Sequence, residues 1–455
     1  MAPDRGEPFR QGDKATRKYL SQHAEPENLL APQVASDHGP FGHGLAIPAQ
    51  AEGTALAHRI ACVPPGPKGP ILIVAVVNAC ADASREVLDS NRHSLEGVQA
   101  RFGLEQHLAP GISVHEHPTG RLILIDRSHS KPLPTKQGVG LARKIGCDFL
   151  LRVMECGAIA SPWLHCSDAD TRLPTDYFAQ AVDQAEKNAT ALHYHFRHRP
   201  DKSEPATYPI AQASESSLRY YVLGLRFAGS THAFHSVGSA LALHGNAYAQ
   251  VRGFPRREAA EDFYILNKLA KLGAIQSLKG TPIEPSSRAS NRVPFGTGAA
   301  IQKLQRAPKE QIQVYHPQVF RYLKTWEATL ARCRAQPRLA QDLSTAVATQ
   351  ASTTPGVESR RLLQALTASD TLARAQRAFN GPTATISQAL CDNLDAFRTL
   401  RLIHALRDTG LGTVGLREAL DQAPFLDFTE GERHLPIGEI ATRFEQLDGG
   451  PLKVP

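Results

Sequence analysis

The run Ile71-Leu72-Ile73-Val74-Ala75-Val76-Val77 decides the fold class of this chain. Seven consecutive apolar residues, most of them β-branched, predict a strand that is buried on both faces. A helical pattern follows from Asp82, and a second apolar run, Leu122-Ile123-Leu124-Ile125, ends in Asp126. Strand, helix and strand at this spacing predict a right-handed crossover, and therefore a parallel sheet. We expect an α/β fold with a mostly parallel sheet flanked by helices.

Polar side chains follow the predicted strands. Asn78 and Asp126 come at the ends of the first two, and the segment Trp163-Leu164-His165-Cys166-Ser167 leads into Asp168-Ala169-Asp170. Ligands of open parallel sheets bind beyond the carboxyl ends of the strands. We therefore expect one cleft to collect these polar residues.

The rest of the chain divides by composition. The stretch Val63-Pro64-Pro65-Gly66-Pro67-Lys68-Gly69-Pro70 cannot sustain a helix or a central strand. Segments 192–196 and 237–243 have strand patterns and are expected to extend the sheet, whereas helix-forming runs dominate from about Pro317. The predicted divisions are a flexible lead-in at 1–69, the α/β domain at 70–316 and a mainly helical C-terminal region at 317–455.

Composition excludes several classes of protein. With 455 residues, 42% of them hydrophobic, the chain can bury a large core, and no apolar run approaches the roughly 18 residues of a membrane span. The net charge of +7 suits anionic ligands, but aromatic residues make up only 6% and no basic stripe suggests nucleic-acid binding. Seven scattered cysteines without a Cys-x-x-Cys pair, and no secretory signal, predict a cytoplasmic protein.

Asp168-Ala169-Asp170 is the first candidate for chemistry. Two carboxylates this close can hold one Mg²⁺ or Mn²⁺ together with the diphosphate of a nucleotide. The motif alone is weak, since Asp-x-Asp arises by chance about once in a chain of this length, and a polar turn is the competing interpretation.

The second candidate is Arg252-Gly253-Phe254-Pro255, followed by Glu261-Asp262-Phe263 at the start of a helical pattern. An acidic pair in this position can simply stabilise the helix terminus. The functional interpretation is a general base that accepts the proton of an attacking hydroxyl.

Taken together, these segments resemble the landmarks of family 2 glycosyltransferases, in order and at plausible separations. The resemblance covers about residues 70 to 300. It implies a GT-A fold and a hexosyltransferase-like enzyme that transfers sugar from a UDP- or GDP-sugar, with inversion at the anomeric carbon and a divalent metal, Mn²⁺ or Mg²⁺. The segments that carry it are 71–78, 125–126, 140–146, 167–171, 252–254 and 261–263.

The resemblance also implies roles for the acidic residues. Asp170 would bind the metal directly, and Asp168 would face the nucleotide sugar beside it. Asp262 would deprotonate the acceptor hydroxyl, and Glu261 would orient the acceptor or its loop. A metal that offsets charge on the departing diphosphate, with a base on the opposite side, forms a consistent mechanism.

For the nucleoside and the diphosphate, the resemblance implies that Asn78 and Asp126 flank the nucleoside and that Arg143 steadies the acidic motif or the diphosphate. Two features depart from the family pattern. The strand before the motif is polar at His165-Cys166-Ser167, and residues 152–161 look like an insertion. Both make the register of Arg143 less certain than that of the acidic motif.

A further segment, residues 286–298, contains Arg288, Arg292, several hydroxyls and a glycine-flanked turn. These groups can cradle a diphosphate, although an ordinary polar surface loop explains them equally well. Some relatives take one more metal ligand from a downstream histidine, for which His316 is the candidate.

Two alternatives remain open. A sugar nucleotidyltransferase needs a glycine-rich, basic loop after its first strand, and residues 78–82 supply neither. A sugar-nucleotide-binding or scaffold protein without turnover would keep the fold, and the intact Asp168, Asp170 and Asp262 argue against it. The acceptor is unknown, and the helical C-terminal region is a candidate for homo-oligomerisation, acceptor binding or partner docking.

Overall fold

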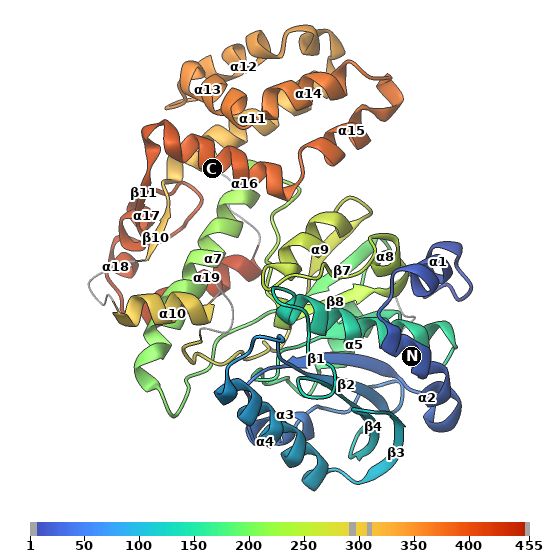
Figure 1. Cartoon of the computed structure of the whole chain (residues 1–455). Helices are drawn as coiled ribbons and strands as arrows, with labels where there is room; N and C mark the ends of the chain where they lie inside the picture. Colours follow the sequence, from blue (N-terminus) through green and yellow to red (C-terminus); the bar gives the residue numbers. More distant parts are fainter. Residues whose placement is uncertain (1–6, 291–296, 307–311, 451–455) are drawn as a thin grey trace. The chain divides into compact units, whose positions relative to one another are not determined.

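The computed structural model describes residues 7–290, 297–306 and 312–450 (Figure 1). It divides into two compact units. The first unit comprises Met1–Pro205 and Ser236–Ala299, and the second comprises Ala206–His235 and Ala300–Pro455. Each unit is described by itself below.

The first unit is built on a mixed sheet. Within the described residues the sheet has nine strands in the order β3-β4-β5-β2-β1-β6-β8-β7-β9. The central strands β5, β2, β1 and β6 are parallel, while β3, β4 and β8 run antiparallel to their neighbours. This confirms the predicted α/β class. The strands are β1 His43–Ala49, β2 Ile71–Asn78, β3 Leu104–Ala109, β4 Ile112–His117, β5 Gly120–Arg127, β6 Trp163–Cys166, β7 Ala189–His193, β8 Leu241–His244 and β9 Ala274–Ser277.

The structure differs from the sequence prediction at residues 1–69, which were expected to form a flexible lead-in. Strand β1 lies in this segment, is buried along its whole length and pairs with β2 on one side and β6 on the other. Its sequence contains Gly44 and Pro48, which are unfavourable in a central strand and hide the pattern. Gly44 is explained by close packing, because an added Cβ would lie 2.7 Å from a Leu150 methyl carbon.

Helices cover both faces of this sheet, and α5 is the most deeply buried of them. Helix α5 packs on β1 and β2, and its Gly146 allows the close approach, since a Cβ there would lie 2.9 Å from that of Ala46. The apparent insertion at 152–161 is the last turn of this helix and the connection to β6. The helices of this unit are α1 Lys14–Gln22, α2 Ala31–His38, α3 Ala55–Ala61, α4 Arg85–Arg101, α5 Gly138–Glu155, α6 Tyr177–Gln184, α8 Gly245–Gln250 and α9 Glu261–Leu269.

A buried polar cluster fastens the N-terminal helix α1 to α5 and α8. The Asp148 carboxylate accepts hydrogen bonds from the hydroxyls of Tyr19, at 2.5 Å, and Tyr248, at 2.8 Å. Lys144 lies 2.7 Å from the other oxygen of the same carboxylate. Satisfied buried networks of this kind fix one arrangement of the elements that they join.

The strand order locates the place where a ligand is expected to bind. Following the chain, β1, β2 and β5 extend the sheet in one direction, whereas β6 is added on the other side of β1. Such a switch point, at the carboxyl ends of parallel strands, is where open α/β sheets bind ligands. Residues 50–52 follow β1 there, and residues 167–170 follow β6.

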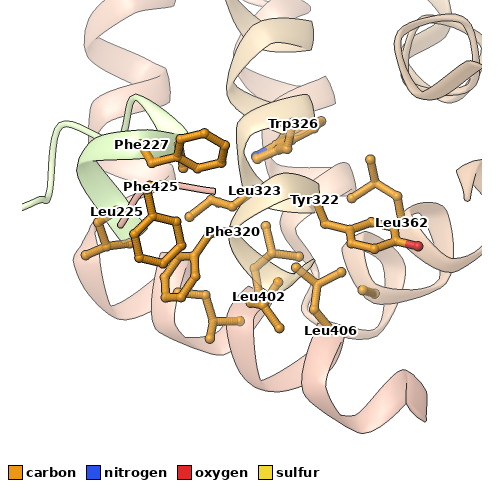
Figure 2. Close-up of a cluster of buried hydrophobic side chains, with 14 of the residues drawn as sticks. Leu225, Phe227, Phe320, Tyr322, Leu323, Trp326, Leu362, Leu402, Leu406 and Phe425 are labelled. Carbon is orange, nitrogen blue, oxygen red and sulfur yellow. The ribbon is translucent and has the colours of Figure 1, made fainter. Parts of the chain in front are cut away.

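The second unit is mainly helical. Figure 2 shows part of its core, where aromatic and leucine side chains from α7, α11, α13 and α16 meet Phe425. Gly224 of α7 permits this packing, since a Cβ there would lie 2.6 Å from the ring of Phe320. Its elements are α7 Tyr208–Ala228, α11 Pro317–Ala335, α12 Leu343–Ser352, α13 Ser359–Ala368, α14 Thr371–Phe379, α15 Ile386–Asn393, α16 Ala396–Leu406, α17 Leu416–Gln422, α18 Glu430–Arg433 and α19 Ile437–Gly449, with β10 Gln313–Tyr315 and β11 Thr413–Gly415; α10 Thr297–Arg306 includes residues of both units.

Helix α7 belongs to this second unit although it precedes β8 in sequence, so the division differs from the boundary expected at residue 317. The reason is the apolar face of α7, whose Tyr220 and Leu223 are buried in the helical core. None of the described helices combines the length and apolarity that crossing a membrane requires.

Candidate active site

The two carboxylates of the acidic motif lie directly after β6. The amide of Ser167 donates to the carbonyl of Ala46 at 3.1 Å, which extends the pairing of β6 with β1, and the amide of Thr171 then closes a turn onto the carbonyl of Asp168 at 3.1 Å. The side chains of Asp168 and Asp170 are 41% and 21% exposed. Both remain within reach of a ligand at the switch point.

Arg143 of α5 connects this motif to the second acidic pair. Its side chain is only 2% exposed; Nη2 donates to Asp168 Oδ1 at 2.8 Å and Nε donates to Glu261 Oε1 at 3.2 Å. The guanidinium carbon lies 5.8 Å from the centroid of the Phe254 ring. The two carboxylates outweigh burial and raise the pKa of Arg143, which is therefore a permanent positive charge between them.

Two glycines allow this close assembly. An added Cβ at Gly140 would lie 2.5 Å from the carbonyl oxygen of Pro255, and one at Gly238 would lie 2.8 Å from Nη2 of Arg143. Gly140 therefore lets α5 approach the loop after Phe254. The structure thus brings four of the sequence landmarks, at 140–146, 167–171, 252–254 and 261–263, into one contact network.

Glu261 and Asp262 form the first turn of α9, after Ala260 in the left-handed conformation with φ 60°. Glu261 is 4% exposed, and burial raises its pKa although Arg143 acts against this. Asp262 is partly exposed and accepts a hydrogen bond from the amide of Phe263 at 2.7 Å. Burial, and then the neighbouring Glu261, raise the pKa of Asp262 to about 7, the range expected of a general base at neutral pH.

Removing the Arg143 charge is expected to destabilise the protein. The Arg143→Gln variant leaves Glu261 buried without its counter-ion, and breaking such a pair typically costs about 3–5 kcal/mol. The loss should shrink as pH falls, because protonation of Glu261 removes the uncompensated charge. Urea unfolding at pH 8 and pH 5 measures it, with Arg172→Gln as the control because Arg172 is 63% exposed. Equal stability of the two variants at pH 8 would contradict this account of Arg143.

Arg288 makes a second arginine contact with the acidic motif. Its Nε donates to Asp170 Oδ2 at 3.0 Å, and its Nη2 donates to Glu52 Oε1 at 2.5 Å. Arg199 Nη2 adds a hydrogen bond to the carbonyl oxygen of Asp170 at 3.1 Å. Glu52 was not predicted as a site residue, because it follows β1 inside the segment expected to be a lead-in. Arg292, the other predicted phosphate-binding arginine, lies outside the described residues.

Asn78 and Asp126 lie at the carboxyl ends of β2 and β5, on the same edge of the sheet as the acidic motif. The Asn78 amide donates to Gln50 Oε1 at 3.4 Å. The Asp126 carboxylate accepts hydrogen bonds of 2.7–3.0 Å from three amides and one hydroxyl in residues 128–130. These bonds outweigh burial and lower the pKa of Asp126, so its carboxylate closes this turn; contact with a nucleoside stays a prediction for both residues.

His316 lies in the second unit and caps α11, where its Nδ1 accepts a hydrogen bond from the amide of Gln318 at 3.1 Å. Burial lowers its pKa, which favours the neutral form of the ring. Because Nδ1 accepts this capping hydrogen bond, a metal would have to bind His316 through the other ring nitrogen, Nε2. That role stays a prediction.

The chemistry of the acidic motif fits Mg²⁺ or Mn²⁺, which take oxygen ligands. Among the described residues, no group of three or more His, Cys, Asp or Glu side chains is arranged to hold a metal ion. The two carboxylates of the acidic motif, Asp168 and Asp170, stay the predicted ligands, and water and a bound substrate would complete the coordination. Mg²⁺ is commonly bound in this way, by one or two carboxylates together with substrate phosphates.

Comparison with known proteins finds solved structures that are similar to this chain only at low TM-scores. No protein-family model matches the chain, and no curated protein matches it either. Among solved structures, the mannosyltransferase PcManGT from Pyrobaculum calidifontis, in complex with GDP-Man and Mn²⁺, is 16% identical with a TM-score of 0.34, covering 84% of this chain and 98% of its own. S. aureus TarS 1–349 in complex with UDP-GlcNAc is 11% identical with a TM-score of 0.32 and 90% of each chain covered. Because TM-scores below 0.5 support no inference, the functional assignment rests on the residues described above.

Proposed function

We propose that this protein is a metal-dependent, inverting glycosyltransferase of the GT-A type that transfers sugar from a nucleotide-diphosphate donor to an acceptor hydroxyl. The observation that carries the proposal is the network around Arg143. It joins Asp168 of the acidic motif to Glu261, whose neighbour Asp262 has a pKa of about 7. A metal-binding motif and a base of suitable pKa thus share one site at the switch point of the sheet.

In this proposal Asp168 and Asp170 hold the metal and the donor diphosphate. When bound, the metal offsets the negative charge that develops on the departing diphosphate. Arg143 keeps Asp168 in position from the buried side, and its displacement would leave the buried Glu261 without a counter-ion. Arg288 is the arginine placed to take a phosphate oxygen, since its planar fork of donors matches phosphate geometry.

Asp262 would receive the proton of the acceptor hydroxyl. As the acceptor oxygen attacks the anomeric carbon, the sugar–phosphate bond breaks on the opposite side, which inverts the configuration. Glu261 contacts Arg143 in the structure, so we assign it the positioning of that arginine and of the first turn of α9. Its negative charge also helps to keep the pKa of Asp262 high.

Nucleotide binding is the direct test of this proposal. Melting temperatures are measured with UDP, GDP and their sugar conjugates, with and without Mn²⁺. A ligand at 100 times its dissociation constant stabilises the native state by about 2.7 kcal/mol. We expect a stabilisation that needs both nucleotide and Mn²⁺. No shift with any of them would reject a nucleotide-sugar enzyme, and binding without transfer to any acceptor would favour a scaffold protein.

The pH dependence of transfer provides a second prediction. Asp262 accepts a proton only in its ionised form, so activity should fall as pH decreases through about 7. We expect kcat/KM to rise about tenfold per pH unit between pH 5 and 6 and to level off above pH 8. Initial rates at saturating Mn²⁺, with the donor affinity measured at each pH as control, test this. A profile that is flat from pH 5 to 8 would contradict the assignment.

A further inference from the structure

Arg288 and Glu52 form a bridge to the acidic motif that the proposed function does not require. Nε of Arg288 donates to Asp170 at 3.0 Å, and Nη2 donates to Glu52 at 2.5 Å while lying 3.0 Å from the same Asp170 oxygen. The Glu52 side chain is 5% exposed, whereas those of Arg288 and Asp170 are 26% and 21% exposed. One end of the bridge is therefore buried, and the other end is accessible to a ligand.

We propose that Arg288, held by Glu52, is bonded to the Asp170 carboxylate in the ligand-free protein and competes with the divalent metal for that carboxylate. A nucleoside diphosphate relieves this competition because its phosphates bind the guanidinium in place of Asp170. The inference rests on the proposed function, because it concerns the same metal site. It assigns to Glu52 the role of a positioning residue. Its consequence is that metal and nucleotide bind together, and that metal alone binds weakly.

Occupied carboxylate oxygens support the competition. Asp168 Oδ1 is already paired with Arg143, and Asp170 Oδ2 is paired with Arg288. A divalent cation arriving alone would have to take an oxygen that Arg288 occupies, and it would lie close to two guanidinium charges. A diphosphate brings negative charge and offers oxygens that suit the guanidinium fork.

The two arginines differ in their freedom to move. Arg143 is 2% exposed and held by the buried Glu261, so it stays on Asp168. Nη2 of Arg288 lies near both Glu52 and Asp170, so the arginine can keep its Nη2 bond to Glu52 while Nε and Nη2 leave Asp170 for phosphate oxygens. The anchor thereby limits the motion to a rotation of the guanidinium and keeps the charge beside the site.

The experiment measures Mn²⁺ binding by the electron paramagnetic resonance of free Mn²⁺, without nucleotide and with saturating UDP or GDP. For the unaltered protein we expect weak binding that nucleotide tightens at least tenfold. Arg288→Gln should bind Mn²⁺ alone at least fivefold more tightly, and the tightening by nucleotide should fall at least fivefold. Because coupling between two ligands is reciprocal, Mn²⁺ should also tighten nucleotide binding less in this variant.

Arg172→Gln is the matched control, because Arg172 is close in sequence to Asp170 but pairs with Glu284 at 3.4 Å. It removes the same charge without touching the Asp170 carboxylate, and we expect Mn²⁺ affinity within twofold of the unaltered protein. Combining Arg288→Gln with Asp170→Asn should abolish the gain in Mn²⁺ affinity. If Arg288→Gln does not fold, Arg288→Lys, which loses the two-pronged contact, should still bind Mn²⁺ alone at least twofold more tightly.

Two results would overturn the inference. Arg288→Gln could bind Mn²⁺ alone no more tightly than Arg172→Gln, or the gain could persist when Asp170 is also replaced. Failure of the proposed function looks different, since no nucleotide would then bind the unaltered protein with Mn²⁺. The comparison of variants with Mn²⁺ alone remains decisive in that case.

Discussion

Asp262→Asn is expected to abolish sugar transfer while leaving donor binding intact. The amide has nearly the size of the carboxylate but cannot accept the proton of the attacking hydroxyl. General-base catalysis typically contributes about 10²–10⁴-fold, so we expect kcat to fall at least about 100-fold. The dissociation constant of the nucleotide with Mn²⁺ should stay within about threefold. Single-turnover transfer and titration of the nucleotide measure the two quantities separately.

The control for this prediction is Glu258→Gln, which removes an exposed carboxylate from the loop before α9. It should keep both transfer and binding. The remaining activity of Asp262→Asn should also lose the pH dependence around 7 that the unaltered protein shows. Full transfer activity of purified Asp262→Asn would show that another group is the base.

Asp170→Ala should eliminate metal-dependent donor binding. In the proposed site the acidic motif contributes two carboxylates to the metal, and this change removes one of them. Replacing residues that merely support a metal ligand costs about 10–100-fold in affinity, and we expect at least about 100-fold for the ligand itself. The stabilisation by nucleotide with Mn²⁺ should therefore disappear from the melting curve, together with transfer.

Asp183→Ala in α6 is the control, because its side chain is exposed. The melting temperature of Asp170→Ala without ligand should stay close to that of the control, since Asp170 is itself partly exposed. A loss of transfer with unchanged Mn²⁺-dependent nucleotide binding would contradict the assignment of Asp170 as a metal ligand. It would instead place the residue on the acceptor side of the site.

Much of the first unit follows from local sequence. The apolar run at 71–77 forms β2, the run at 122–125 lies in β5, and the segment at 163–166 forms β6. The first two are recognisable because a strand buried on both faces needs apolar side chains at consecutive positions. The positions of the acidic residues could also be predicted locally. They depend only on where the strands end and where α9 begins.

The sequence did not reveal β1 or Glu52. Strand β1 lies between β2 and β6; its Gly44 allows the close approach of Leu150 from α5, and its Pro48 lies beyond the residues that pair with β6. Such stabilisation comes from residues distant in the sequence, so a local pattern does not show it. The contact of Glu52 with Arg288 likewise joins positions that are 236 residues apart.

The sequence by itself determined the α/β class, the carboxyl ends of β2, β5 and β6, and the identity of the carboxylates. Only the tertiary structure decided which arginines pair with those carboxylates and how the carboxylates shift one another's pKa. Arg143 reaches Asp168 and Glu261 because α5 packs against the sheet, and the pKa of Asp262 rises to about 7 because folding desolvates this partly exposed carboxylate beside a second one. Desolvation and charge coupling depend on distances in space, which the order of residues does not specify.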